Sequence, residues 1–167
     1  MRTLVISDIH SNSDALKAVI SDAVVFDRVW CLGDVVGYGP DPNECIQILK
    51  SLPRLVCILG NHDAAVMGFI ELSAFNNEAS AAIMIQERML SQESREFLEL
   101  LEVQRVEDGI TLAHGSPRNP IWEYVMNART AKENFSAFDT QVCLIGHSHI
   151  PVIFIDDHSK HPGILLP

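Results

Sequence analysis

The sequence contains no apolar run of about 18 residues, which is the length that a helix needs to cross a membrane. The chain begins with a short apolar stretch that ends in an acid at Asp8, and this is not the pattern of a secretory signal peptide. No linker, internal repeat or low-complexity segment interrupts the chain. These absences predict a cytoplasmic protein that is not inserted in a membrane.

Positive charge and paired cysteines are also scarce. Twelve Lys and Arg residues face 22 Asp and Glu residues, so the net charge is -10. Such a surface repels a polyanion and disfavours nucleic acid as a partner, although a cation-rich pocket can still attract a small phosphate ester. The four cysteines form no C-x-x-C pair, and three of them lie in apolar runs. We therefore expect reduced thiols rather than disulfides or a zinc site.

The chain does have enough apolar residues for a globular core. Hydrophobic residues make up 47% of its 167 residues. A chain of this length forms one domain that buries roughly 70% of its unfolded surface. We expect a single domain over residues 1–167, with residues 156–167 as an irregular or shortened tail.

Three strand–loop–helix units fill the first sixty or so residues. Short apolar runs at residues 3–6, 29–32 and 55–59 predict buried strands. Apolar residues at helical spacing follow the first run, where Asn12 or Ser13 can cap the helix, and the second run, where Asp41 and Glu44 form a capping box. This alternation predicts a parallel sheet with right-handed crossovers.

The second half of the chain has a helical segment followed by further strands. Residues 71–101 predict two helices that are separated near Ser91, and the second buries Phe97, Leu98 and Leu101. This segment either covers the sheet or forms a lid or partner surface. Apolar runs at residues 110–113, 142–145 and 152–155 predict three more strands.

Clusters of polar residues follow five of the predicted strands. These residues are Asp8, His10, Asp34, Asn61, His62, Asp63, His114, His147 and His149. One such cluster is most simply a turn that caps a helix. Five of the seven histidines lie in these clusters, however, and the strand ends of an open α/β sheet meet at its ligand-binding edge. The other two histidines, His158 and His161, fit a solvated tail.

The mixture of imidazole, carboxylate and amide groups predicts a transition-metal site. These donors suit Mn, Fe or Zn and match poorly the all-oxygen sites of Ca²⁺ or Mg²⁺. There are too many ligands for one tetrahedral ion and enough for two. Two ions about 3.5–4 Å apart are the usual device for attack on phosphorus.

The clusters resemble the motifs of the calcineurin-like metallophosphoesterase superfamily, in particular its small bacterial and archaeal phosphoesterases. The matching motifs are Asp8-x-His10, Gly33-Asp34, Gly60-Asn61-His62-Asp63, His114 and Gly146-His147-Ser148-His149. The resemblance implies an α/β fold, a four-layer αββα sandwich of two mixed sheets flanked by helices. Relatives of this kind continue beyond the last motif, so the C-terminal part looks shortened. A second subunit that covers an exposed sheet edge would follow from this, giving a homo-oligomer.

The resemblance also implies a role for each residue. The first metal ion would be held by Asp8, His10 and His149, and the second by Asn61, His114 and His147. Asp34 would bridge the two ions. His62 would protonate the leaving group, and Asp63 would orient the His62 ring. Other residues have two open readings. Asn12 and Arg118 would hold substrate phosphate, or they are a helix cap and a surface charge. Tyr38, Trp122 and Tyr124 would stack on a nucleobase, or they are buried aromatics.

The implied function is that of a dinuclear-metal-dependent phosphoesterase. It would hydrolyse phosphomonoesters or phosphodiesters of small molecules or nucleotides by attack of a metal-bridging hydroxide. Manganese is the first choice of metal, with Fe, Zn, Ni and Co as alternatives. The loop at residues 35–40 has no arginine, which argues against a protein serine/threonine phosphatase. The main alternative is a non-catalytic scaffold on the same fold, but the presence of His62 favours the enzyme. A nuclease is a weaker alternative.

Overall fold

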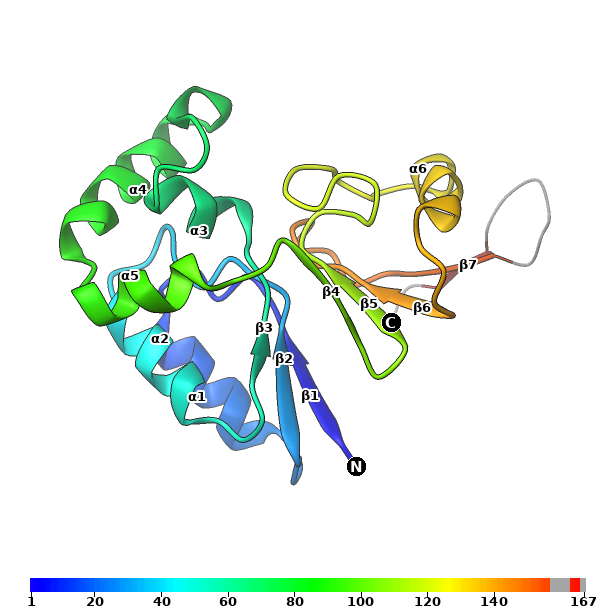
Figure 1. The fold of residues 1–167 in the computed structure, drawn as a ribbon, viewed down its shortest axis with the longest axis horizontal. Helices are drawn as coiled ribbons and strands as arrows, with labels where there is room; N and C mark the ends of the chain where they lie inside the picture. The colour runs from blue at the N-terminus through cyan, green and yellow to red at the C-terminus, as the bar shows by residue number, and fades with distance from the viewer. Residues whose placement is uncertain (157–162, 166–167) are drawn as a thin grey trace.

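The first sheet is parallel and carries three strands in the order β1-β2-β3. The computed structural model describes residues 1–156 and 163–165. In it β1 spans Thr3–Ile6, β2 spans Arg28–Cys31 and β3 spans Val56–Cys57 (Figure 1). Ile6 pairs with Cys31, which pairs in turn with Cys57. The parallel sheet that the alternating pattern predicted is therefore confirmed, although β3 is shorter than the apolar run at residues 55–59.

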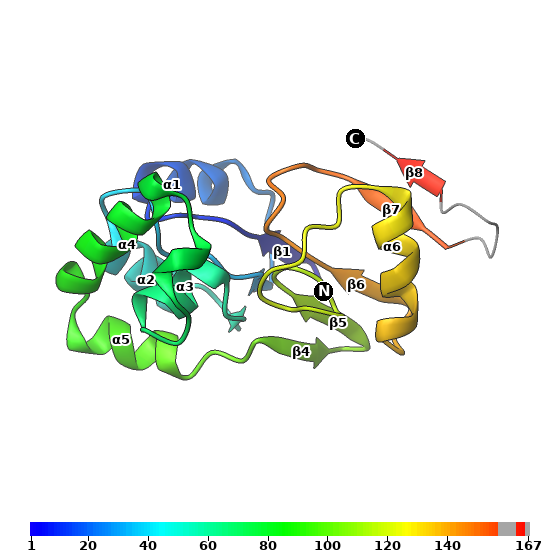
Figure 2. The same ribbon diagram turned by 90° about the horizontal axis from the view of Figure 1, so that it is seen from above.

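Helices cover one face of this sheet (Figure 2). They are α1 (Ser13–Asp22), α2 (Pro42–Ser51), α3 (Asn61–Val66), α4 (Asn77–Met89) and α5 (Gln92–Glu99), with the short η1 (Leu72–Ala74) before α4. The predicted break at Ser91 is confirmed, because its backbone and hydroxyl cap α5. Buried side chains from the helices and the strand ends form a first core, which includes Leu16, Val35, Ile46, Leu49, Ile83 and Leu98.

The caps of the first two helices differ from each other. Asn12 caps α1, because its Oδ1 atom accepts the backbone N–H of Ala15 at 3.0 Å. Asp41 precedes α2, but its side chain makes no capping hydrogen bond to the helix, so the predicted capping box is wrong. Its Oδ2 atom instead accepts the hydroxyl of Ser13 at 3.1 Å, which ties the start of α2 to the start of α1.

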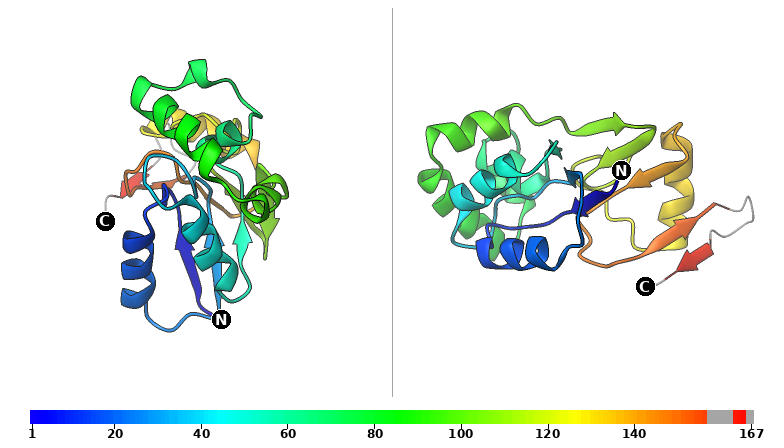
Figure 3. Two further views of the ribbon diagram at one scale, coloured as in Figure 1. Left: turned by 90° about the vertical axis from the view of Figure 1, so that its left-hand side faces the viewer. Right: turned by 90° about the horizontal axis from the view of Figure 1, so that it is seen from below.

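The second sheet has the order β4-β5-β6 and is mixed. Its strands are β4 (Gln104–Glu107), β5 (Ile110–Ala113) and β6 (Val142–Leu144), with β4 antiparallel and β6 parallel to β5. A second core lies between the two sheets and consists of Trp30, Leu32, Ile58 and Leu112, with Val56, Ile110 and Leu144 against them. Helix α6 (Ala128–Asn134) and the short η2 (Phe135–Ala137) lie on the outer side of this sheet (Figures 2 and 3). The predicted four-layer arrangement is confirmed. The prediction of two mixed sheets is correct for the second sheet and wrong for the first, whose described strands all pair in parallel.

A small antiparallel pair, β7 (Ile153–Ile155) and β8 (Gly163–Leu165), lies at the far end of the molecule (Figure 3). The expectation of an irregular tail is therefore wrong at residues 163–165. His158 and His161 lie outside the described residues. All four cysteines are free thiols. Within the described ranges, no helix combines the length and the apolar character that a membrane crossing requires.

Candidate metal centre

The polar clusters meet at the carboxyl ends of strands from both sheets. Five loops contribute, those that follow β1, β2, β3, β5 and β6. They deliver Asp8 and His10, then Asp34, then Asn61 and His62, then His114, and finally His147 and His149. All but Asp8 and His114 line one cavity of about 210 Å3, together with Tyr38, Tyr124 and Ser148. Loops far apart in sequence thus gather these donors in one place, as the strand-end positions predicted.

The first group of donors consists of Asp8, His10 and His149. The Nε2 atom of His149 lies 3.3 Å from the Oδ1 atom of Asp8 and 3.1 Å from the Nε2 atom of His10. One ligand atom from each residue lies within 4.8 Å of the other two. This spacing suits a single metal ion that is bound by one carboxylate and two imidazoles.

The second group consists of Asp34, His114 and His147, with Asn61 beside them. The Nε2 atom of His114 lies 3.0 Å from the Oδ1 atom of Asn61, 3.2 Å from the Nδ1 atom of His147 and 3.3 Å from the Oδ2 atom of Asp34. All four side chains are buried. A second ion would therefore be enclosed by protein, whereas His149 leaves the first group open to solvent.

Asp34 lies between the two groups. Its Oδ2 atom is 3.7 Å from the Nε2 atom of His10 and 3.3 Å from the Nε2 atom of His114. Its Oδ1 atom accepts the backbone N–H of His62 at 2.9 Å. Gly60 allows this approach, because a Cβ atom there would lie 2.1 Å from the Asp34 Oδ1 atom. Only a carboxylate in this position offers anionic oxygens to both groups.

Backbone carbonyls fix the orientation of two ligand histidines. The Nδ1 atom of His114 donates to the carbonyl of Leu32 at 2.8 Å, and that of His10 donates to the carbonyl of Val36 at 3.2 Å. In each ring the Nε2 atom is then free to act as the ligand atom and points toward the centre. The sequence did not reveal these two carbonyl partners.

The backbone is strained where the ligands lie. Nine described residues other than glycine have a positive φ angle, and five of them are the candidate ligands Asp8, His10, Asp34, His147 and His149. Their φ angles lie between 49° and 65°, in the left-handed region that side chains with a Cβ atom rarely adopt. Strain of this kind costs on the order of 1–3 kcal/mol per residue and is typical of functional sites.

Burial and charge shift the pKa values of the buried ligands in opposite directions. Burial lowers the pKa of His147 to about 4. Burial would also lower the pKa of His114, but its hydrogen bond and charge interaction with Asp34 raise that pKa to about 9. Burial alone would raise the pKa of Asp34, but His114 brings that pKa below its usual value. Without a metal ion, a proton on His114 therefore balances the charge of Asp34.

His62 and Asp63 do not form the predicted pair. The carboxylate of Asp63 accepts the backbone N–H groups of Val36 and Gly60, each at 3.0 Å. It therefore holds two loops together, while the Nδ1 atom of His62 has no hydrogen-bond partner in the described part of the chain. Rings surround His62 instead: those of His10 and Tyr38, each at 4.7 Å, and that of Phe75 at 5.1 Å. Burial lowers the pKa of His62 to about 4.

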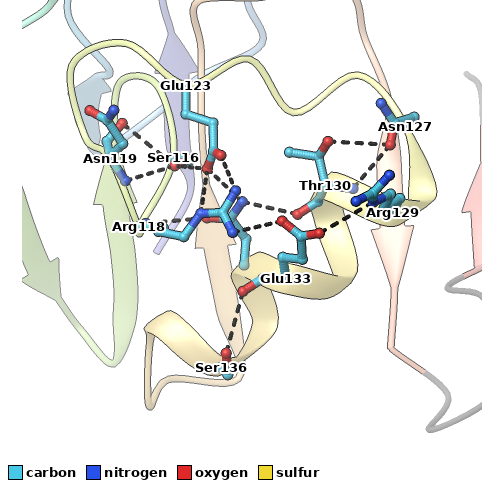
Figure 4. Close-up of polar contacts among 10 residues, drawn as sticks. Ser116, Arg118, Asn119, Glu123, Asn127, Arg129, Thr130, Glu133 and Ser136 are labelled. Atoms are coloured by element: carbon cyan, nitrogen blue, oxygen red, sulfur yellow. Dashed lines mark hydrogen bonds and ion pairs between the residues drawn. The ribbon is translucent and has the colours of Figure 1, made fainter.

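The two weaker candidates for phosphate binding have other partners. Asn12 is the cap of α1. Arg118 forms ion pairs with Glu123 and Glu133, and Glu123 also accepts hydrogen bonds from Ser116 and Asn134 (Figure 4). The Arg118 guanidinium holds the pKa of Glu123 down at about 2. The alternative readings of these residues, a helix cap and a surface charge, agree better with the structure.

Sequence reasoning missed Gln86, a buried residue on α4. Its Oε1 atom accepts the Ser11 hydroxyl at 3.0 Å and the Gly37 backbone N–H at 2.7 Å, and its Nε2 atom donates to the Gly39 carbonyl. It therefore holds the glycine-rich loop on both sides of Tyr38. A helical glutamine carries no signal in the sequence that would mark this role.

Comparisons with known proteins support the resemblance that the sequence motifs indicate. The model of the calcineurin-like phosphoesterase superfamily domain matches residues 1–165. A metallophosphoesterase of Sphaerobacter thermophilus is 46% identical, with a TM-score of 0.82, over 93% of this chain and 63% of its own. An uncharacterized protein of Methanocaldococcus jannaschii is 36% identical over 97% of this chain and 66% of its own length. A symmetrical bis(5'-nucleosyl)-tetraphosphatase of Pseudomonas fluorescens is 43% identical over 38% of this chain and 24% of its own length. The chain spans less than two thirds of each of these proteins.

Proposed function

Because the chain belongs to the calcineurin-like phosphoesterase superfamily, we propose that it is a phosphoric ester hydrolase that uses two metal ions around Asp34. The observation that carries this proposal is the pair of donor groups that meet at one carboxylate. The first group contains Asp8, His10 and His149. The second contains Asp34, His114 and His147, with Asn61 beside them. Manganese is the proposed metal, with Fe, Zn, Co and Ni as alternatives, because imidazole and carboxylate donors suit these ions.

When bound, two such ions supply an activated water and neutralise charge on the phosphate. The chain itself contributes a fixed geometry, because the hydrogen bonds of His10, His114 and Asp34 orient the donors before substrate arrives. Burial of His114 and Asp34 keeps bulk water away from the second group.

His62 is the proposed proton donor to the leaving group. Its ring lies beside that of His10, and with Asp34 these residues form a third candidate donor group, so a ligand role for His62 has to be tested as well. A pKa of about 4 leaves His62 neutral before substrate binds. An anionic phosphate oxygen next to the ring raises that pKa, which is the direction that a proton donor needs.

The proposed substrates are small phosphate esters, including nucleotides. The name of the Pseudomonas fluorescens relative, a bis(5'-nucleosyl)-tetraphosphatase, supports a nucleotide, although only 38% of this chain is aligned with it. A cytoplasmic location and a homo-oligomeric state remain predictions, as does a single domain.

Hydrolysis of a chromogenic phosphodiester and a chromogenic monoester tests the function, with Mn²⁺ added to the metal-free protein. We expect turnover that depends on the metal. We expect the His62→Ala variant to lose roughly 10²–10⁴-fold in kcat. The variant should keep its metal content. Loss of metal in this variant would indicate that His62 is a metal ligand and not the proton donor. If neither ester is hydrolysed with Mn, Fe, Co, Ni or Zn, the non-catalytic scaffold is the better reading.

A further inference from the structure

His147 differs from His10 and His114 in how its ring is held. Its Nδ1 atom lies 3.2 Å from the Nε2 atom of His114 and therefore faces the second donor group. A backbone carbonyl orients each of the other two rings, but the buried Nε2 atom of His147 makes no hydrogen bond in the described part of the chain. Burial lowers the pKa of His147, and the nearby backbone of Trp122 works against this shift. The orientation of the His147 ring therefore has to come from packing.

Tyr124 supplies this packing. Its ring is stacked on that of His147, with the centroids 3.8 Å apart and the planes 22° from parallel. The described ring contacts of His10 and His114 with other side chains are longer, at 4.7 Å or more. Rotation of the imidazole about its Cβ–Cγ bond would break the face-to-face contact. The stack therefore fixes the plane of the His147 ring.

The segment that carries Tyr124 is anchored outside the metal centre. Glu123, its neighbour in sequence, accepts the Ser116 hydroxyl at 2.7 Å and the side-chain amide of Asn134 at 2.8 Å, and it pairs with Arg118 (Figure 4). Ser116 and Asn134 are both buried. The position next to Tyr124 is thus tied to helix α6 and to the loop after β5, which keeps the tyrosine ring in place.

The exposure of Tyr124 argues against a role in the core alone. The residue is 52% exposed and lines the metal-site cavity, so it is not the buried aromatic that one reading of the sequence predicts. A ring that leaves half of its surface in water gains only part of the stabilisation that full burial gives. Its place over a ligand imidazole indicates a function at the metal centre.

We propose that Tyr124 is a positioning residue for the second metal ion, because its ring fixes the imidazole plane of His147 in place of an outer hydrogen bond. This inference rests on the proposed two-ion site. The lone pair of Nδ1 lies in the plane of the imidazole, so a tilt of the ring turns the lone pair away from the ion. Groups that orient a ligand histidine change metal affinity by roughly 10–100-fold when they are removed.

Manganese binding to the metal-free protein tests this inference without reference to turnover. Competition with a fluorescent chelator gives a Kd for each bound ion. We expect Tyr124→Leu to weaken one site roughly tenfold and to leave the other unchanged, because the stacking contact involves the second group only. Tyr124→Phe keeps the ring and removes the hydroxyl, so it should bind both ions as the wild type does.

A double-mutant cycle connects the effect to His147. His147→Ala removes the ligand itself and should weaken the same site more than Tyr124→Leu does. Adding Tyr124→Leu to His147→Ala should then change the Kd less than about twofold, because no imidazole remains to be oriented. Phe69→Leu is the matched control, since it removes a ring that is 54% exposed and does not line the cavity. It should bind both ions as the wild type does.

NMR of the metal-free protein gives a second measurement. The ring current of a stacked tyrosine moves the imidazole C–H signals upfield, and comparison with His147→Ala assigns these signals to His147. We expect them to move downfield in Tyr124→Leu and to stay in place in Tyr124→Phe. Thermal unfolding of each variant shows that it is folded.

The outcomes separate this inference from the proposed function. Two ions bound equally well by the wild type and by Tyr124→Leu would overturn the role of Tyr124 and leave the two-ion site standing. The role is also overturned if Tyr124→Phe binds as weakly as Tyr124→Leu, or if Tyr124→Leu has the same effect with and without His147. A wild type that binds a single ion would overturn the two-ion site. The role of Tyr124 then stands if the affinity for that ion shows the same coupling to His147, and falls if it does not.

Discussion

The Oδ2 atom of Asp34 lies 3.3 Å from the Nε2 atom of His114, deep inside the protein and 3.7 Å from the Nε2 atom of His10. One carboxylate oxygen thus faces an imidazole of each donor group. Without a metal ion, the pair is held by a proton on His114, whose pKa is about 9. Metal binding has to displace this proton, which couples occupancy of the site to pH.

The first prediction concerns this carboxylate. Asp34→Asn replaces two anionic oxygens by a neutral amide that has one oxygen, so we expect the affinity for Mn²⁺ to fall at least tenfold and turnover to fall with it. Elemental analysis of the desalted protein and a metal titration measure the effect. Asp14→Asn, at an exposed position in the first turn of α1, is the matched control. An Asp34→Asn variant with full metal content would show that Asp34 is not shared between the groups.

The second prediction concerns the stability of the metal-free protein as a function of pH. His114 binds a proton more tightly in the folded state, so its contribution is complete below about pH 6.5 and is lost as the pH rises toward about 9. His62 and His147 have folded pKa values of about 4, so their contribution is lost as the pH falls from about 6.5 toward 4. We therefore expect the free energy of unfolding to be greatest near pH 6.5.

Asp63 reduces the slope on the acid side. Burial raises its pKa to about 6, so its contribution is lost as the pH rises and opposes that of one histidine. Burial also lowers the pKa of His10, which adds to the slope on the acid side. On the alkaline side, His114 alone gives a slope of up to about 1.4 kcal/mol per pH unit. Urea unfolding in the presence of a chelator measures it. His114→Gln should flatten the alkaline side only, and an unfolding free energy that keeps rising between pH 6.5 and 9 would contradict the assignment.

The third prediction assigns Arg118 to stability. The guanidinium joins Glu123 and Glu133, and Glu123 is mostly buried and has further partners. Arg118→Ala leaves that carboxylate without its charged partner, so we expect the free energy of unfolding to fall by clearly more than in the control variant. Arg129, which contacts the same Glu133 at 3.4 Å and is 90% exposed, is the matched control. Arg129→Ala should change the unfolding free energy by less than about 0.5 kcal/mol.

Much of the fold and the position of the candidate site could be predicted from local patterns. Apolar runs that end in Asp8, Asp34 and His114 located the strands and placed the polar clusters at their ends. Such a prediction works because strand burial and the end of a strand are both encoded within a few neighbouring residues. The parallel order of the first sheet followed from the helices between its strands.

Features that depend on contacts between distant segments could not be predicted. The hydrogen bonds of Gln86 to Gly37 and of Asp63 to Val36 join residues far apart in sequence. The left-handed backbone of the ligand residues is imposed by the loops packed around them. The β4–β5 hairpin is a different case, because Asp108-Gly109, with φ angles of 48° and 76°, is a turn signal that the sequence itself carries.

The last prediction uses two glycines with positive φ angles in different surroundings. Gly37 has a φ of 102°, and a Cβ atom there would lie 2.4 Å from the Nδ1 atom of His62. Gly109, in the hairpin turn, has a φ of 76° with no atom within 4 Å of its Cβ position. Alanine is strained in both places by about 1 kcal/mol, but only at position 37 does it displace a functional ring.

Gly37→Ala should therefore lower kcat at least tenfold while the protein keeps its metal content, because His62 is moved and the other donors remain. Gly109→Ala should lower the melting temperature about as much as Gly37→Ala does, because the backbone strain is similar, and it should leave kcat unchanged. Steady-state kinetics, elemental analysis and thermal unfolding of both variants make the comparison. If Gly37→Ala loses metal together with activity, the contact matters for the donor groups as a whole. Equal kcat values in the two variants would mean that the position of His62 does not limit the reaction.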